Sequence, residues 1–214
     1  MRQNAGVFRY RIAEVGSSDF ATWLQLRTDL YLETGLITPD ELDPAGLFVD
    51  AYERHSVHVL ASDDHGVDIG CTRLIDGTDG APLQVTDMFG ITPLSRPSEA
   101  SGTAVVAPYR KSWVSLGLYR ALFEIAVDRG HEHRYAILEP RYLASLRALG
   151  YPYEVVGEPM DVFGYPNIAG VYPLADLLAS MQKAEGPSAS VIYHYFARPF
   201  GWTLTEKDLL EAAP

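Results

Sequence analysis

The sequence has little cysteine, no internal repeat and no long apolar run. Cys71 is its one cysteine, so the chain cannot close an internal disulfide. No stretch approaches the ~18 consecutive apolar residues that a membrane-spanning helix requires. Segment 1–15 has neither an apolar signal core nor a small-residue cleavage site. These absences predict a cytoplasmic protein that does not span a membrane.

Positive charge is also scarce, and it is unevenly distributed. The 17 lysines and arginines are outnumbered by 28 aspartates and glutamates, so the net charge is −11 and binding to nucleic-acid backbones is not expected. Residues 101–150 hold seven basic and four acidic residues, which makes this segment +3 and the rest of the chain −14. The segment has two interpretations: solvated helix faces, or a cationic patch for an anionic ligand or partner.

The composition is that of a globular domain. The 214 residues are 47% hydrophobic and 21% charged, which is enough apolar material for a sizeable core. We expect residues 1–160 to form the main body of the fold. Residues 161–214 are expected to complete the same domain as a C-terminal extension.

Hydrophobic periodicity predicts a mixed α/β protein. Strands are expected at 7–15, 56–62, 67–75, 102–106, 135–140, 151–157 and 190–196. Helices are expected at 18–34, 110–130, 141–150 and 174–183. The strand–helix–strand–helix–strand order over 102–157 implies a partly parallel sheet with helices on its faces. Residues 76–100, which contain several prolines and glycines, are predicted to form a long loop.

The most specific motif lies where the strand predicted at 102–106 leads into the next helix. The run Val106-Ala107-Pro108-Tyr109-Arg110, together with the element order, resembles the GNAT acyltransferase superfamily. Within it, the branch is that of the acyl-homoserine-lactone (autoinducer) synthases and the N-acyl amino acid synthases. The resemblance covers roughly residues 20–160. It implies a central mixed β-sheet flanked by helices, and transfer of an acyl group from a phosphopantetheine thioester to an amine.

The resemblance also implies a phosphate-binding turn at the start of this helix. Its candidate residues are Arg110, Lys111, Ser112, Trp113 and Ser115. Successive N–H groups at a helix N-terminus bind phosphate oxygens, and glycine lets a diphosphate approach the backbone closely. Trp113 and Ser115 stand where the superfamily has glycine and glycine or alanine. The single phosphate of a carrier-protein arm therefore fits the turn better than the diphosphate of coenzyme A.

These residues predict the donor and the partner. We expect an acyl carrier protein, docked through the basic segment 110–147, to present an acyl-phosphopantetheine; acyl-coenzyme A is the alternative donor. No permanently bound cofactor is expected. No metal is expected either, since His131 and His133 lack the usual third ligand. Leu146 stands where many superfamily members have a general-acid tyrosine. The leaving group needs little protonation near neutral pH, because an ordinary thiol has a pKa of about 8.5, so the absence of this acid does not exclude catalysis.

Five residues match the autoinducer-synthase pattern and are predicted to bind the acceptor substrate. They are Arg27, Tyr31, Asp50, Glu53 and Arg73. The arginine that the pattern has three residues after Glu99 is replaced by Gly102, so we expect an acceptor amine other than that of the lactone synthases. Structural roles also stay open. Asp50 and Glu53 could form an exposed helix face, and Arg73 could pair with an acid across its hairpin.

Amide formation from a thioester needs a base for the amine and donors for the carbonyl oxygen. Glu99, at the entrance to the central strand, is predicted to be the base; the alternative is a solvated loop carboxylate. Asp50 and Glu53 are the second candidates. The resemblance assigns the oxyanion donors to the backbone N–H groups of Val105 or Val106, whose side chains are expected in the core.

Two other functions stay open on the sequence alone. One is a coenzyme A-dependent N-acetyltransferase with an atypical phosphate turn. The other is a non-catalytic module that kept the fold to bind an acyl chain or a partner, because a fold does not by itself establish activity.

Overall fold

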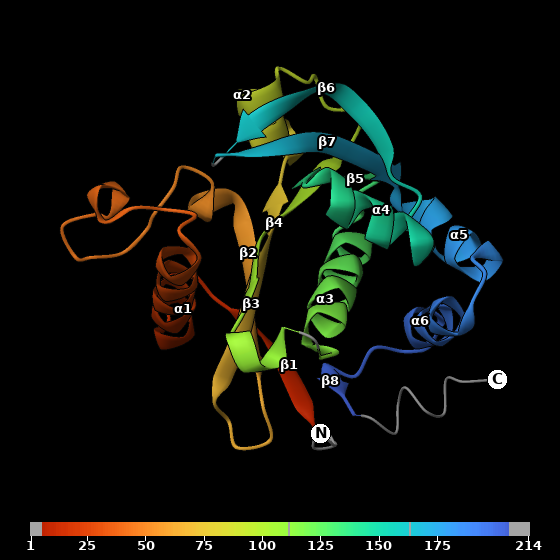
Figure 1. Cartoon of the computed structure of the whole chain (residues 1–214), viewed down its shortest axis with the longest axis horizontal. Coiled ribbons are helices and arrows are strands. Elements are labelled where there is room, and N and C mark those ends of the chain that lie inside the picture. The colour runs from red at the N-terminus through yellow and green to blue at the C-terminus, as the bar shows by residue number, and fades with distance from the viewer. Residues whose placement is uncertain (1–5, 111, 163, 206–214) are drawn as a thin grey trace.

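The computed structural model describes residues 6–110, 112–162 and 164–205. Within them, an eight-stranded sheet runs in the order β6-β7-β5-β4-β3-β2-β1-β8 (Figure 1). The strands are β1 (Phe8–Ala13), β2 (Ser56–Ser62), β3 (Asp68–Asp76), β4 (Pro97–Val105), β5 (His133–Leu138), β6 (Glu154–Val162), β7 (Tyr165–Pro173) and β8 (Thr203–Leu204). The α-helices are α1 (Ser18–Thr34), α2 (Gln84–Phe89), α3 (Val114–Asp128), α4 (Pro140–Ala148), α5 (Leu177–Lys183) and α6 (Pro187–Ala197). The predicted mixed α/β class is confirmed. Across the described part of the chain, no helix combines the length and apolarity needed to cross a membrane.

Helix α1 packs on one face of strands β1 to β4, and α3 packs on the opposite face (Figure 1). Ser17 caps α1 by accepting the N–H of Phe20 at 3.1 Å, and Gly35 ends the helix in the left-handed region with φ 69°. Trp23 is fully buried, and its indole N–H donates to the Thr72 carbonyl of β3 at 2.9 Å. These contacts fix α1 against the middle of the sheet.

Helix α3 approaches the sheet closely. A Cβ at Gly117 would lie 2.0 Å from the Tyr10 ring of β1, so only glycine fits this contact. Leu118 and Leu122 are fully buried next to it. The close approach places the first turn of α3 beside the end of β4.

Strand β4 has two partners of opposite direction. It pairs antiparallel with β3, with an irregularity between Ser101 and Ala104 where Gly102 has φ 67°. It pairs parallel with β5 only from Pro97 to Ala100, where Ala136 is the last partner. Beyond Ala100 the two strands diverge, and this divergence positions the site.

Several predicted boundaries are corrected by the structure. Residues 190–196 are helical within α6, because Ala189, Ile192 and Phe196 are buried at helical spacing. β7, at Tyr165–Pro173 in the predicted C-terminal extension, forms where the sequence predicted no strand, and it pairs with both β5 and β6. β4 begins at Pro97 and α2 precedes it, so much of the predicted loop at 76–100 is regular structure.

Candidate active site

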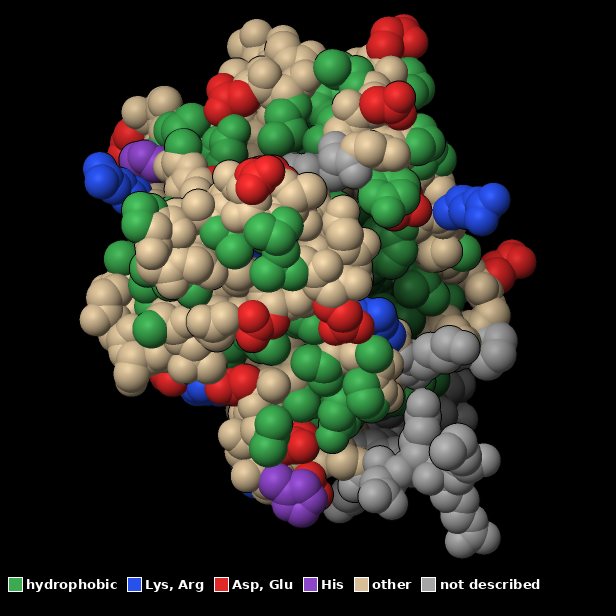
Figure 2. Space-filling view, turned by 60° about the vertical axis from the view of Figure 1, so that its left-hand side comes forward, with side chains coloured by type: hydrophobic (Ala, Val, Ile, Leu, Met, Phe, Trp, Pro, Cys, Tyr) green, Lys and Arg blue, Asp and Glu red, His purple; other side chains and the backbone are tan. Residues whose placement is uncertain are grey.

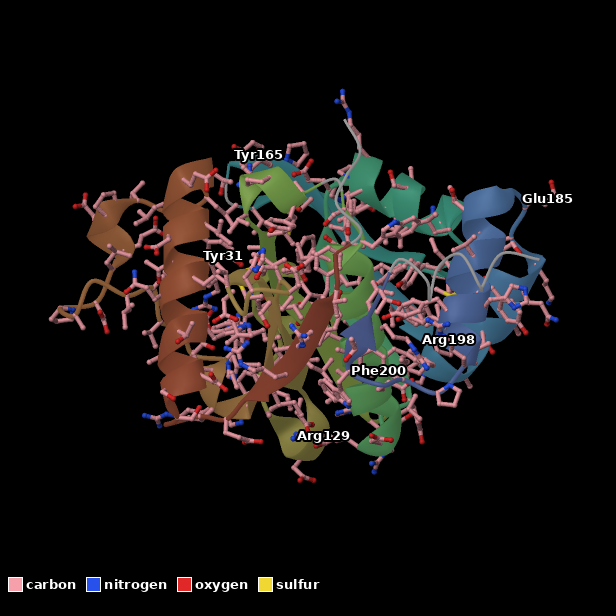
Figure 3. The ribbon with its side chains drawn as sticks, turned by 90° about the horizontal axis from the view of Figure 1, so that it is seen from below. Tyr31, Arg129, Tyr165, Glu185, Arg198 and Phe200 are labelled. Atoms are coloured by element: carbon pink, nitrogen blue, oxygen red, sulfur yellow. The ribbon has the colours of Figure 1, made fainter. Side chains whose placement is uncertain are left out.

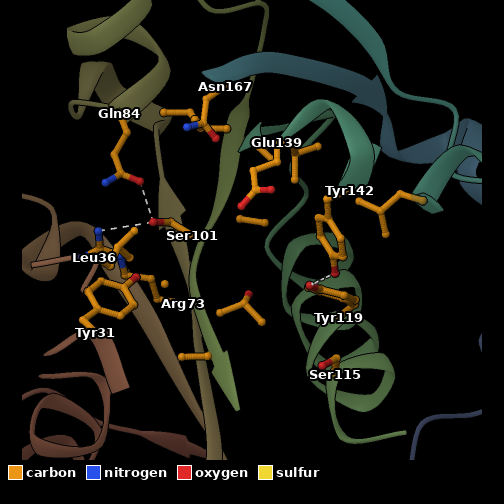
Figure 4. Close-up of a pocket in the computed structure, with 18 of the residues that line it drawn as sticks. Tyr31, Leu36, Arg73, Gln84, Ser101, Ser115, Tyr119, Glu139, Tyr142 and Asn167 are labelled. Atoms are coloured by element: carbon orange, nitrogen blue, oxygen red, sulfur yellow. Dashed lines mark hydrogen bonds between the residues drawn. The ribbon is translucent and has the colours of Figure 1, made fainter. Parts of the chain in front are cut away.

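A cavity of about 560 Å³ opens where β4 and β5 diverge (Figure 4). β4 lines it from Ala100 to Val105, and β5 lines it from Ala136 to Leu138. Because the two strands no longer pair there, their facing backbone groups are available to a ligand. One side of the cavity reaches α1, and the other lies between α3 and α4.

The hydrogen-bond ladder decides which backbone N–H groups point into this cavity. The N–H of Val106 donates to the Ile69 carbonyl at 3.0 Å, so the prediction that Val106 supplies a free oxyanion donor is wrong. Alternate residues of an antiparallel strand point to opposite sides, so Val105 and Thr103 direct their N–H groups away from β3. The N–H and C=O of one residue in such a strand point to the same side. The Val105 carbonyl accepts the Nε–H of Arg110 at 3.0 Å, which agrees with this direction.

Four predicted acceptor-binding residues form one buried ion network. Arg73 donates from both terminal nitrogens to the two Asp50 oxygens, each at 2.7 Å. Arg27 lies 2.5 Å from Glu53 Oε1 and also donates to the Phe48 carbonyl at 2.6 Å. Both arginine side chains are 1% exposed, so each guanidinium charge depends on a carboxylate partner.

Glu53 links this network to a histidine. Burial opposes ionisation of Glu53, but the hydrogen bond from His58 at 2.8 Å and the charges of Arg73 and Arg27 outweigh it and lower its pKa to about 2. Glu53 is therefore a carboxylate at neutral pH. The segment that carries Asp50 and Glu53 is not an exposed helix face, since only a single 3-10 turn forms at Glu53–His55.

The cavity separates the five predicted acceptor-binding residues into two groups. Tyr31, Asp50 and Arg73 line it, whereas Arg27 and Glu53 lie behind them. Tyr31 points from α1 toward the sheet (Figure 3), and burial raises the pKa of its hydroxyl to about 12. Arg27 and Glu53 therefore act on the cavity wall through Arg73 and Asp50.

Glu99, the predicted base, is fully buried in β4 and does not line the cavity. Its Oε2 accepts the N–H of Val85 in the first turn of α2 at 3.1 Å. Burial raises its pKa to about 8 against the opposing effects of Val85, Arg73 and Gln84, so the group is largely protonated at neutral pH. The position supports a structural role, in which Glu99 holds α2.

Two other carboxylates border the cavity, and they differ in their partners. Asp50 is held by Arg73, whereas no ion pair of Glu139 occurs among the described residues. Glu139 follows β5 directly and begins α4, and its exposed carboxylate points toward the cavity (Figure 4). Among the residues that the structure describes, no group of three or more histidine, cysteine, aspartate or glutamate side chains could hold a metal ion.

Polar side chains from α2, α3 and α4 complete the cavity wall. Ser101 of β4 donates its hydroxyl to the Gln84 side chain at 2.5 Å and lies 3.4 Å from Arg73 Nη2. Tyr119 and Tyr142 pair through their hydroxyls between α3 and α4 (Figure 4). The wall is thus polar near α1 and aromatic near α4.

The comparisons with known proteins bear on the fold. No protein-family model matches the chain, and no curated protein matches it significantly in sequence. The solved structure of BjaI with MTA, a CoA-dependent acyl-homoserine lactone synthase, has a TM-score of 0.68 at 19% identity, over 96% of this chain and 98% of that one. TofI, in a ternary complex with an inhibitor and MTA, has a TM-score of 0.65 at 22% identity, over 80% and 95%. FeeM, an N-acyl amino acid synthase from uncultured soil microbes, has 0.64 at 11%, over 81% and 94%. The protein has a GNAT-like fold.

The residues predicted to form a phosphate-binding turn differ in their position relative to the cavity. Arg110 and Ser115 line the cavity mouth. Ser112 instead donates its hydroxyl to the Tyr109 carbonyl at 2.6 Å, and Trp113 is 38% exposed outside the cavity lining. Lys111 lies outside the described residues.

The structure buries part of the positive charge on which the predicted docking segment 110–147 depends. Two of its arginines, Arg120 and Arg134, are 3% exposed. Arg110 pairs with Glu33 at 3.0 Å, and Arg147 donates to the Tyr153 carbonyl. Figure 2 shows the side of the molecule on which α1 lies, where acidic side chains recur and basic ones are sparse. Arg110, Arg129, Arg141 and Arg147 are exposed, so burial removes only part of the positive charge of this segment from the surface.

Four functional candidates in this GNAT-like fold were not identified from the sequence: Gln84, Ser101, Thr103 and Glu139. Ser101 and Thr103 belong to the irregular part of β4, a strand whose start the sequence misplaces. Gln84 lies in α2, within the stretch predicted to be a loop. Glu139 carried a usable signal, because a carboxylate directly after a buried strand and before a proline marks a strand-to-helix corner.

Proposed function

We propose that the protein is an N-acyltransferase that moves an acyl group from a phosphopantetheine thioester to the amine of a small molecule by direct attack. One observation carries the proposal. β4 and β5 part at Ala100 and Ala136 and leave a cavity that faces unpaired backbone donors and reaches the first turn of α3.

The donor arm enters past the first turn of α3. Val105 at the mouth lies five residue steps along β4 from Ala100 at the strand junction, a length of about 16 Å for an extended strand. An extended phosphopantetheine arm spans a similar length. Its phosphate lies near Arg110 and the N-terminal N–H groups of α3, and its thioester lies near the junction.

The reaction follows from the groups around the junction. Outward N–H groups two residues apart on a strand lie about 7 Å apart, so only one of them reaches the carbonyl oxygen. The N–H of Thr103, the nearer to the junction, stabilises the negative charge that develops there, and the N–H of Val105 binds the donor arm. The amine attacks the carbonyl carbon, the C–N bond forms, the C–S bond breaks, and the sulfur leaves as thiolate. Glu139 accepts the proton that the amine loses, directly or through one water, and that proton then passes to the thiolate.

The acceptor binds on the α1 side of the cavity. Asp50 presents a carboxylate there that attracts an ammonium group, and Ser101 and Gln84 supply hydrogen bonds beside it. Tyr31 adds an aromatic face. A small amine that carries a further polar group fits this lining better than an apolar amine.

The donor arm has two sources. An acyl carrier protein is the first candidate, because Trp113 and Ser115 replace the small residues of a diphosphate-binding turn. Coenzyme A is the second. It is favoured by the position of Trp113 outside the cavity lining and by the fold shared with BjaI, which is a CoA-dependent synthase.

The test is release of free thiol by the purified protein. An acyl carrier protein and coenzyme A, each loaded with the same acyl group, are incubated separately with a panel of small amines, and the amide product is identified by mass spectrometry. Amide formation with either donor is the expected result. If neither donor is deacylated, the enzyme proposal fails and the non-catalytic module takes its place. A clear preference for coenzyme A removes the carrier-protein part.

A further inference from the structure

The end of the cavity opposite Arg110 has an unusual lining. Three tyrosines and one arginine meet there, and all four are at least nine-tenths buried: Arg134 (3% exposed), Tyr151 (6%), Tyr153 (6%) and Tyr172 (1%). Leu138 and Leu146 complete the wall with apolar surface. The pocket therefore has apolar surface along its sides, with polar groups set into it.

Arg134 lacks the compensation that the other buried arginines have. Arg27, Arg73 and Arg120 each pair with a carboxylate. Within the described ranges, no carboxylate lies within ion-pair distance of Arg134; its Nη2 donates to the Leu122 carbonyl at 2.7 Å, and its Nε has no partner. A buried cation without a counter-charge is costly, so the position favours a ligand that brings an electronegative atom.

Tyr151 is the second unsatisfied group in the pocket. Its ring packs against Tyr153 and Tyr172, with ring centroids 6.2 Å from each, but its buried hydroxyl has no hydrogen-bond partner. Buried hydroxyls are normally satisfied, and those that are not need an explanation. Burial raises the pKa of Tyr151 well above its usual value, so the hydroxyl keeps its proton and can donate it.

The pocket lies where the acyl group of a bound thioester would extend. Arg134 precedes Ala136 by two residues, so it lies about 7 Å along β5 beyond the point where the strands part, on the side away from the mouth. A thioester at the junction therefore directs its acyl chain toward Arg134 and Tyr151. This distance of about 7 Å suits a short acyl chain or an acyl group with one aromatic ring.

We propose that this pocket selects acyl groups whose far end carries an acceptor oxygen, bound by Tyr151 Oη and Arg134. The inference rests on the proposed acyl transfer and adds the class of acyl substrate. A hydroxyl or a carboxylate supplies the same acceptor chemistry. A hydroxyl makes a neutral hydrogen bond to Tyr151, whereas a carboxylate also neutralises the charge of Arg134.

Three donors of equal chain length distinguish these ends: hexanoyl-, 6-hydroxyhexanoyl- and adipoyl-coenzyme A, with the matched carrier-protein thioesters in parallel. We expect kcat/KM for at least one oxygenated donor to exceed that for hexanoyl by about tenfold, the value of one buried hydrogen bond. A preference for 6-hydroxyhexanoyl indicates that the hydrogen bond to Tyr151 determines the selection. A preference for adipoyl indicates that the charge of Arg134 determines it. Equal or better use of hexanoyl overturns the inference and leaves the acyltransferase proposal standing.

The variant Tyr151→Phe removes one hydroxyl and keeps the ring. It is expected to abolish most of the preference for the oxygenated donor while changing hexanoyl turnover little. Tyr165→Phe is the matched control, since Tyr165 is 46% exposed and lies at the periphery of the molecule (Figure 3). An unchanged preference in Tyr151→Phe, with Arg134→Met also unchanged or unfolded, overturns the assignment.

Binding without turnover separates this inference from the proposed function. Dissociation constants of the three coenzyme A thioesters are measured by calorimetry in the absence of any amine. Tighter binding of an oxygenated donor, lost in Tyr151→Phe, supports the pocket even if no amine is acylated. Equal binding of all three contradicts it.

Discussion

Arg73 and Asp50 form a two-point ion pair at the edge of the cavity, with both nitrogen–oxygen distances at 2.7 Å. Arg73 is buried, and Asp50 retains 17% exposure of its side chain. The pair joins the interior ion network to the cavity wall. A change in either residue therefore alters both stability and the acceptor side of the site.

Arg73→Gln is expected to destabilise the fold strongly. It removes one of the two arginines that Asp50 and Glu53 share, and breaking a buried pair by removing one partner costs about 3 to 5 kcal/mol. Urea denaturation measures the loss. Arg11→Gln is the control, because Arg11 pairs with Asp68 at 2.6 Å while 35% exposed, and such pairs contribute less than about 1 kcal/mol. Equal losses in the two variants contradict the network described here.

Glu99→Gln is expected to leave turnover at pH 7 nearly unchanged and to alter the pH dependence of stability. The pKa of Glu99 is about 8 in the folded chain and lies at its ordinary value of 4.5 when unfolded. The folded state therefore binds the extra proton between these values, and the free energy of unfolding falls as pH rises through this range. Between pH 5 and 8 the fall contributed by this group is as much as about 4 kcal/mol. Melting curves at several pH values measure it, and they flatten in Glu99→Gln. A large loss of turnover in this variant with intact folding restores Glu99 as the base.

Glu139→Gln is expected to lower kcat by about 100-fold without a matching change in stability, since it removes a proton acceptor at the junction. Glu154→Gln, on the exposed edge strand β6, is the matched control and keeps full activity. Steady-state kinetics with saturating donor and amine make the measurement. Normal kcat in Glu139→Gln assigns the proton transfer to another group.

Arg110→Ala is expected to raise KM for the donor by roughly five- to tenfold with kcat little changed, because Arg110 acts on the phosphate rather than on the thioester. The effect shrinks at high salt. Arg141→Ala is the control, since Arg141 is an exposed arginine outside the cavity lining. A loss in kcat with unchanged KM rules out this role.

The sequence predicts most of the helices and strands but misplaces residues that depend on register. Ser17, Gly35 and the apolar spacing of α3 give clear signals, and those elements form as expected. Glu99 was expected in a loop because the apolar part of β4 begins only after it. In the structure the strand starts earlier, and a strand position alone decides which face a side chain takes.

Long-range contacts decide the remaining differences. Arg27, Asp50, Glu53 and Arg73 were identified as a set, yet the sequence does not show that two of them lie behind the other two. Val105 and Val106 differ in whether the backbone N–H points away from β3 or toward it. That direction depends on the register of β3 and β4, which shifts near Gly102. The basic segment was identified from charge counts, which do not distinguish a buried arginine such as Arg134 from an exposed one.

The parallel pairing between β4 and β5 is short, and its end affects how fast the backbone amides of β4 exchange with solvent. Four residue pairs, from Pro97–His133 to Ala100–Ala136, make up this pairing. Beyond it, the amide hydrogens of Thr103 and Val105 face the cavity, while those of Ala104 and Val106 face β3. Hydrogen–deuterium exchange is therefore expected to alternate along these four residues, fast at 103 and 105 and slow at 104 and 106. A bound donor is expected to slow exchange at residues 103 and 105, so these two amide protons indicate whether the cavity is occupied.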